Sequence, residues 1–114
     1  RNAAGSAPLA SLLVTNTAPP AVTGTAATVS GTTADVSCDA SPAADAAGYL
    51  FVYSTDPDFD PTIAGTVGYQ GTSRSGEIPG LMAGTTYYLC AAAYDTWSST
   101  RSQLNFAPAI TFNT

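Results

Sequence analysis

The sequence predicts an all-β fold in which seven strands form a sandwich of two packed sheets. Two observations lead to this fold class. From residue 19 onward apolar and polar residues alternate with a period near two, and turn-forming residues recur roughly every 8–12 positions. No window shows convincing helical periodicity. At 114 residues the chain is long enough to bury one core and too short for two, so we expect one sandwich.

The first three strands are expected over residues 21–29, 33–39 and 49–53. In the second strand the alternation places Cys38 on the core side and the acidic residues beside it in water. The third strand is apolar on both faces. A strand of this kind is covered on both sides or lies in an interface.

The remaining four strands are expected over residues 66–69, 74–78, 87–95 and 104–112. The segment Asp56–Pro61 contains two prolines that cannot continue a ladder, so it is expected to be a loop. Residues 96–103 are expected to form a hairpin loop that carries Trp97. Pro108, inside the last predicted strand, implies an edge strand or a bulge.

The charge balance limits the possible functions. Three basic residues stand against eight acidic ones, for a formal net charge of -5, so nucleic acid is not an expected partner. Histidine and lysine are absent, which removes the usual general base and any Schiff-base nucleophile, and we expect no enzyme. Charged residues make up only 10% of the chain, a balance that suits extracellular proteins and the faces of assemblies.

Several spaced motifs between residues 18 and 114 resemble a fibronectin type III domain of the immunoglobulin-like superfamily, in a bacterial-type secreted or surface version. The motifs are Pro19-Pro20, Gly48–Ser54, Leu81-x-x-Gly84-Thr85-x-Tyr87, Ala93-x-Asp95 and the closing run Ala109–Thr114. The resemblance implies a seven-stranded sandwich with a tyrosine corner. It also implies a module that scaffolds or binds in most settings and seldom performs chemistry, in an extracellular or cell-surface location.

Whether the two cysteines can form a disulfide depends on the register of the sixth strand. If Tyr87 is the corner tyrosine, as in fibronectin type III domains, Cys90 faces outward. If Tyr88 is the corner, as in immunoglobulin counting, Cys90 turns inward to face Cys38. We expect a Cys38–Cys90 disulfide, with two inert thiols as the alternative.

Asp56, Asp58 and Asp60 alternate as D-x-D-x-D, a spacing that can direct carboxylates at calcium. The signal is weak because Pro61 replaces the glycine of a calcium-binding EF-hand loop, and the alternative is a solvated acidic loop. No other cofactor is expected.

Trp97 is a candidate interaction residue, since tryptophan is enriched in interface hot spots and this loop rests on a rigid frame. The alternative is that its ring folds back over Ala91–Ala93 and fills space. Tyr53, Tyr69 and Tyr94 could form a face that stacks on carbohydrate, although scattered tyrosines in a sandwich are more often half-buried sheet residues.

Residues 1–18 are expected to be an N-terminal extension and residues 19–114 the sandwich domain. The extension contains a β-prone apolar run over residues 9–15 that includes Leu9, Leu12, Leu13 and Val14. It is far shorter than the roughly 20 residues that span a bilayer, so no direct membrane span is expected. Left in water, such a strand is an aggregation hazard. It could pair with its own sandwich, add to the edge of a neighbouring subunit, pack on a separate chain or be a linker.

These observations favour a non-enzymatic structural or interaction module. Within that class they favour a subunit of a surface filament or pilus-like assembly, held by the N-terminal strand and partnered by copies of itself or another filament subunit. The alternatives are an accessory spacer domain of a secreted polysaccharide-degrading enzyme, or an adhesin that binds through Trp97 and the Asp56–Asp60 loop.

Overall fold

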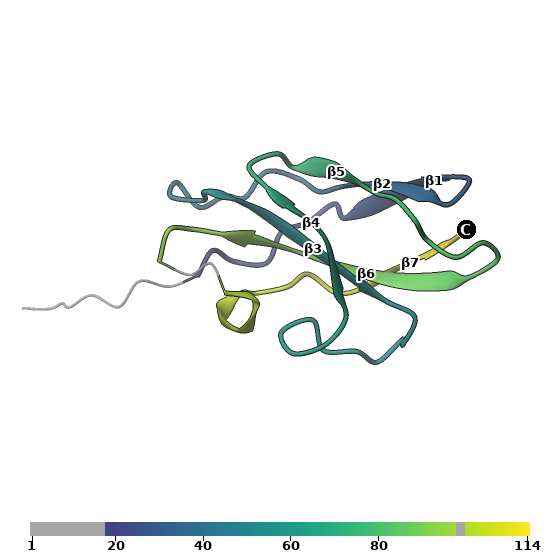
Figure 1. The fold of residues 1–114 in the computed structure, drawn as a ribbon. Coiled ribbons are helices and arrows are strands. Elements are labelled where there is room, and N and C mark those ends of the chain that lie inside the picture. The colour runs from purple at the N-terminus through teal and green to yellow at the C-terminus, as the bar shows by residue number, and fades with distance from the viewer. Residues whose placement is uncertain (1–17, 98–99) are drawn as a thin grey trace, which may run out of the picture.

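The computed structural model describes residues 18–97 and 100–114, which form two antiparallel sheets packed face to face (Figure 1). The three-stranded sheet has the order β1-β2-β5 and comprises β1 (Ala26–Ser30), β2 (Thr33–Ser37) and β5 (Ser75–Ile78). The four-stranded sheet has the order β4-β3-β6-β7 and comprises β4 (Thr66–Gly71), β3 (Gly48–Ser54), β6 (Thr86–Tyr94) and β7 (Ile110–Asn113). The predicted all-β sandwich of seven strands is confirmed.

Two strands begin several residues later than the sequence predicted. β1 begins at Ala26 rather than at residue 21, because Gly24 has a φ of 69°, a left-handed conformation that interrupts an extended strand. β7 begins at Ile110 rather than at residue 104, and a short 3-10 helix, η2 (Arg101–Gln103), lies in the loop before it. Pro108 lacks the N–H that a ladder needs, and β7 is an edge strand.

The main core lies between the two sheets and follows the period-two alternation of the strands. Ala34 and Val36 of β2 point into it, as predicted, and Cys38 follows them. Phe51 of β3 is fully buried and packs at 6.1 Å, centroid to centroid, against the ring of Tyr69. This core fixes which face of each strand points inward.

A tyrosine corner sets the register of β6. The hydroxyl of Tyr87 accepts a hydrogen bond from the backbone N–H of Met82 at 2.9 Å, across a turn in which Gly84 has a φ of 65°. Tyr87 points into the core and stacks on Phe112 at 5.4 Å. Leu89, two residues further on, also points inward, so Tyr87 rather than Tyr88 is the corner residue.

Candidate functional site

The outer face of the four-stranded sheet, the face away from the three-stranded sheet, carries a second apolar cluster. Leu50 and Val52 of β3 and Ala92 of β6 are buried there, although antiparallel sheets commonly leave such a face to water. Leu104 covers them, together with the half-buried rings of Phe59 and Phe106. We call Phe59, Leu104 and Phe106 the outer layer.

The outer layer explains why β3 is apolar on both faces. The sequence left two possibilities, coverage within the domain or burial in an interface. The structure places much of that coverage within the chain itself, because the β3–β4 loop and the segment after η2 lie on the outer side of the sheet (Figure 1).

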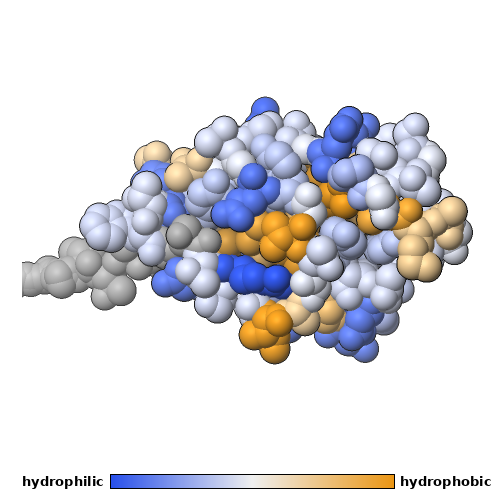
Figure 2. Space-filling model, viewed as in Figure 1, coloured by the Kyte–Doolittle hydropathy of each residue, from blue (hydrophilic) through white to orange (hydrophobic). Residues whose placement is uncertain are grey.

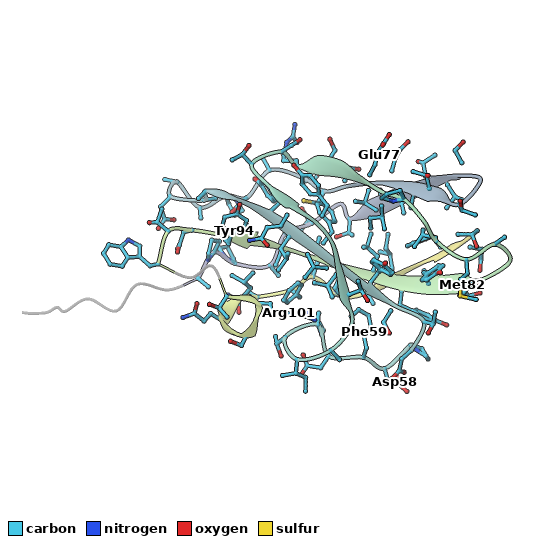
Figure 3. All side chains as sticks on the ribbon, viewed as in Figure 1. Asp58, Phe59, Glu77, Met82, Tyr94 and Arg101 are labelled. Atoms are coloured by element: carbon cyan, nitrogen blue, oxygen red, sulfur yellow. The ribbon has the colours of Figure 1, made fainter. Side chains whose placement is uncertain are left out.

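Arg101 joins the two segments that form this layer. Its guanidinium donates hydrogen bonds to the backbone carbonyls of Pro61 at 2.9 Å, of Gly65 at 3.4 Å and of Ala64. Arginine suits this role because its planar group presents several donors in a fixed arrangement. Figure 3 shows Arg101 and Phe59 on the same side of the sandwich, with Glu77 of β5 on the opposite side.

Between these segments lies an open cleft of about 630 Å³, which we call the outer cleft. Residues 59–62 and 104–109 line it, with Ala21 and Cys90. Asn105 ties the start of the described chain to this region, because its side-chain N–H donates to the carbonyl of Pro19 at 3.0 Å. The outer cleft is therefore bounded by three segments that are distant in the sequence.

Among the described residues that line the outer cleft, Asp60 is the only one with a charge. Its pKa lies below the ordinary value, because the Thr62 hydroxyl and backbone N–H both donate hydrogen bonds to it. Burial raises the pKa of the Cys90 thiol, and the negative charge of Asp60 adds to this. A thiol that remains protonated is a poor nucleophile, so these groups suit binding better than covalent chemistry.

The predicted disulfide is absent, since Cys38 and Cys90 are both free. The register of β6 is the cause. Cys90 pairs across the ladder with Val52, which belongs to the outer cluster, whereas Cys38 lies in the core between the sheets. The two thiols therefore lie on opposite sides of the four-stranded sheet, and the expectation of a bond between them was wrong.

Two of the three aspartates that suggested calcium accept hydrogen bonds from residues of their own loop. The carboxylate of Asp56 accepts from the N–H of Asp58 at 2.9 Å, and Asp60 accepts from Thr62. Across residues 18–97 and 100–114, no three side chains of the His, Cys, Asp and Glu types come together in a group that could hold a metal ion. The structure does not bring Asp56, Asp58 and Asp60 into one site.

Trp97 lies on the loop after β6 with 75% of its side chain exposed, so its ring does not pack on Ala91–Ala93. Those alanines are fully buried without it. The backbone at Trp97 is held by a hydrogen bond from its N–H to the carboxylate of buried Asp95 at 2.8 Å. The predicted interaction residue is therefore available at the surface on a fixed turn.

The proposed tyrosine face is not assembled. Tyr53 and Tyr69 pack against the main core, and Tyr53 meets Tyr87 edge to face at 5.7 Å. Tyr94 instead packs against the outer cluster, on the other side of the sheet. These tyrosines are therefore half-buried sheet residues, which was the alternative that the sequence left open. They present no common surface for a sugar.

The candidate interaction residues Leu9, Leu12, Leu13 and Val14 lie outside the described residues. Sequence reasoning missed Arg101, Asn105 and the outer layer. The only signal that could have found them was β3, whose two apolar faces require a cover on each side.

The surface is weakly polar over much of the face shown in Figure 2, with hydrophobic residues gathered near the middle of that face and on the loop below it. None of the helical structure in the described part of the chain has the length and apolarity that crossing a membrane requires.

No protein family model matches the sequence, and no curated protein matches it. Solved structures do match, and they show that the fold is that of a fibronectin type III domain. The solution structure of the sixth fibronectin type III domain of human fibronectin type III domain containing protein 3 is 21% identical, with a TM-score of 0.66. That match covers 89% of this chain and 90% of the other.

Two matches come from longer structures. The crystal structure of chicken CNTN1 FN1-FN3 domains is 19% identical with a TM-score of 0.68; the match covers 85% of this chain and 33% of that one. The crystal structure of the Clostridium perfringens spore cortex lytic enzyme SleM is 18% identical with a TM-score of 0.61, and the match covers 85% of this chain and 29% of that one. This chain therefore spans about a third of the length of each.

Proposed function

We propose that this chain is a non-enzymatic interaction domain of an extracellular or cell-surface assembly, in which the N-terminal segment of one copy binds the next copy. The observation that carries the proposal is the position of the strands. All seven strands of the described sandwich lie between Ala26 and Asn113, so the described part of the chain completes the sandwich, and the apolar, β-prone run Leu9–Thr15 lies outside the described residues.

An apolar β-prone strand is normally covered, because it otherwise promotes aggregation. Another copy of the chain can supply that cover by strand addition. The contact would join two different surfaces, the segment of one copy and the body of the next, and contacts of this kind generate open filaments when they do not close into a ring. The low charge of the chain supports close packing of copies.

Electron microscopy of the full chain beside a form lacking residues 1–17 tests this proposal. We expect filaments from the full chain and monodisperse particles from the shortened form. Circular dichroism would establish that both forms keep the same β content. Monodisperse particles from both forms would contradict the proposal.

A second candidate is an accessory spacer domain of a secreted polysaccharide-degrading enzyme. It is favoured by the similar fold in the structure of the spore cortex lytic enzyme SleM. In that case residues 1–17 act as a linker, and limited proteolysis would cut them at the same rate at all protein concentrations. A filament strand would instead become protected as concentration rises.

A third candidate, an adhesin, is favoured by the exposure of Trp97. Its ligand-binding surface would combine Trp97 with the Asp56–Asp60 loop. Trp97→Ala should then abolish binding to a surface ligand without a change in folding, whereas filament formation should not change.

A further inference from the structure

We propose that the outer cleft of one copy receives residues Leu9–Thr15 of a neighbouring copy as an added strand beside residues 104–109. This inference rests on the proposed function, since it names the acceptor for the same N-terminal segment. A smaller cavity of about 270 Å³ lies on the three-stranded sheet, where Asp35 and Glu77 line it and make it less suited to an apolar strand.

The chemistry of the outer cleft suits an apolar strand. Its walls include Phe59, Phe106 and Leu104, and Asp60 is the only charged group among the described residues that line it. The guanidinium of nearby Arg101 already donates to three backbone carbonyls. The cavity of about 630 Å³ lies within the range of roughly 300–1,000 Å³ typical of ligand pockets.

The backbone along one wall of the outer cleft is open to pairing. Residues 104–109 lie outside any ladder, and one backbone hydrogen bond, from Ala107 N–H to the carbonyl of Ala91 at 2.8 Å, ties residues 105–109 to β6. The N–H groups of Asn105, Phe106 and Ala109 have no partner among the described residues. Unpaired backbone groups beside a sheet are a template for an added strand.

The segment has a suitable pattern. In an extended conformation Ala10, Leu12 and Val14 share one face, because side chains alternate with a period of two. Leu9, Ser11, Leu13 and Thr15 lie on the other face, which is therefore mixed. At about 3.3 Å per residue the seven residues span roughly 23 Å, enough to run along residues 104–109. The fully apolar face would enter the outer cleft.

The position of residues 18–20 favours a neighbouring copy over the same chain. The Asn105 side chain binds the carbonyl of Pro19, so the chain passes the outer cleft at that point. Pro19 and Pro20 hold the backbone from Ala18 onward in an extended conformation. To fill its own cleft, the segment would have to reverse within Asn16 and Thr17, immediately before this stiff stretch.

A cross-linking experiment on the full chain tests the proposed contact, because Cys90 lines the outer cleft and Val14 belongs to the inserted face. We expect the Val14→Cys variant, under mild oxidation, to form a disulfide between the introduced thiol and Cys90 of another copy. Peptide mapping would identify the bond, and a ladder of linked chains would appear on a non-reducing gel. The double variant with Cys90→Ser should lose the ladder.

Two results would overturn the inference. A bond to Cys90 within one chain would show that the segment covers its own cleft. Assembled material in which the introduced thiol never bonds to Cys90, although a thiol reagent labels Cys90 in the dispersed chain, would place the segment elsewhere. Cys38, on the far side of the sheet, provides an internal control because no bond to it is expected.

Two charge substitutions test whether the outer cleft is the acceptor, separately from whether the chain assembles through its N-terminal segment. Ala109 is exposed and lines the outer cleft, whereas Ala26 is exposed on β1 of the other sheet. Ala109→Arg should lower the sedimentable polymer about tenfold or more, because it places a bulky charged side chain where the apolar strand would lie. Ala26→Arg should change it by less than about twofold.

Leu12→Asp and its matched control Ser11→Asp complete the test. Loss of polymer in Leu12→Asp with full assembly in Ala109→Arg would retain the proposed function and overturn the outer cleft as acceptor. Absence of polymer in the unmodified chain would overturn both. If Ala109→Arg does not fold, as judged by circular dichroism, the cross-linking result decides.

Discussion

The two faces of the four-stranded sheet are buried in different ways. The inner face packs against a second sheet, so both partners are regular strands with alternating side chains. The outer face is covered by irregular chain, the β3–β4 loop and the segment after η2, joined by one guanidinium. The core on the inner face contains many more buried residues than the outer cluster, and the outer side also carries the open outer cleft.

The largest contrast should come from truncating one side chain on each face. Phe51→Ala, in the main core, should lower the free energy of unfolding by about 3–5 kcal/mol, and Leu104→Ala in the outer layer by about 2 kcal/mol, because a loop can collapse into the space. Chemical denaturation measures both values. Equal losses would show that the outer layer is as integral to the fold as the inner core.

Arg101→Ala tests the join between the two outer segments. It removes hydrogen bonds to three backbone carbonyls, and we expect a loss of about 1–2 kcal/mol with faster amide exchange in the β3–β4 loop. Arg101→Lys should not restore stability, because an ammonium cannot match the planar arrangement. Arg74→Ala, at an exposed arginine, is the control and should change stability by less than about 0.5 kcal/mol.

Tyr87→Phe tests the register that separates the two faces. It removes the acceptor of the Met82 N–H and should cost about 1 kcal/mol in thermal or chemical unfolding. Tyr88→Phe is the matched control, because this side chain makes no hydrogen bond to a described residue, and its effect should be near zero. The opposite order of effects would mean that the corner tyrosine has been misassigned.

The smallest effect concerns pH, with one thiol on each face. Burial raises the pKa of Cys38 and of Cys90 above the ordinary value of 9.0; Arg74 partly offsets this at Cys38, and Asp60 adds to it at Cys90. The unfolded chain therefore loses these protons first, and stability should fall as pH rises above about 9. Urea unfolding of Cys38→Ala and Cys90→Ala between pH 7 and 10 should show a weaker decline than the unmodified chain. An unchanged slope would refute this account.

The inner face could be predicted from the sequence because it follows a period of two. Ala34 and Val36 of the facing β2 lie where alternation places them, whereas alternation could not assign a face to Phe51, because β3 is apolar on both sides. The register of β6 was ambiguous because Tyr87 and Tyr88 are adjacent and either could be the corner tyrosine. The expected disulfide required the Tyr88 register, which is shifted by one residue and places Cys90 on the core side of the sheet instead of the outer side. Alternation alone cannot choose between the two tyrosines.

The outer face could not be predicted, because its partners lie in irregular chain that has no period. Arg101 reaches carbonyls of residues 61–65, which no local pattern marks. Residues 104–109 have the composition of a strand, yet they run outside the ladder, with Pro108 among them. Trp97 was identified as a candidate residue, but its exposure depends on the turn fixed by Asp95.

Hydrogen exchange with mass spectrometry, comparing assembled and dispersed full chain, tests most directly whether the outer cleft holds a neighbour's N-terminal strand. The account predicts that residues 9–15 and 104–109 gain protection together on assembly, while β1 exchanges at the same rate in both states. Protection of residues 9–15 with gains at β1 and none at 104–109 would contradict it.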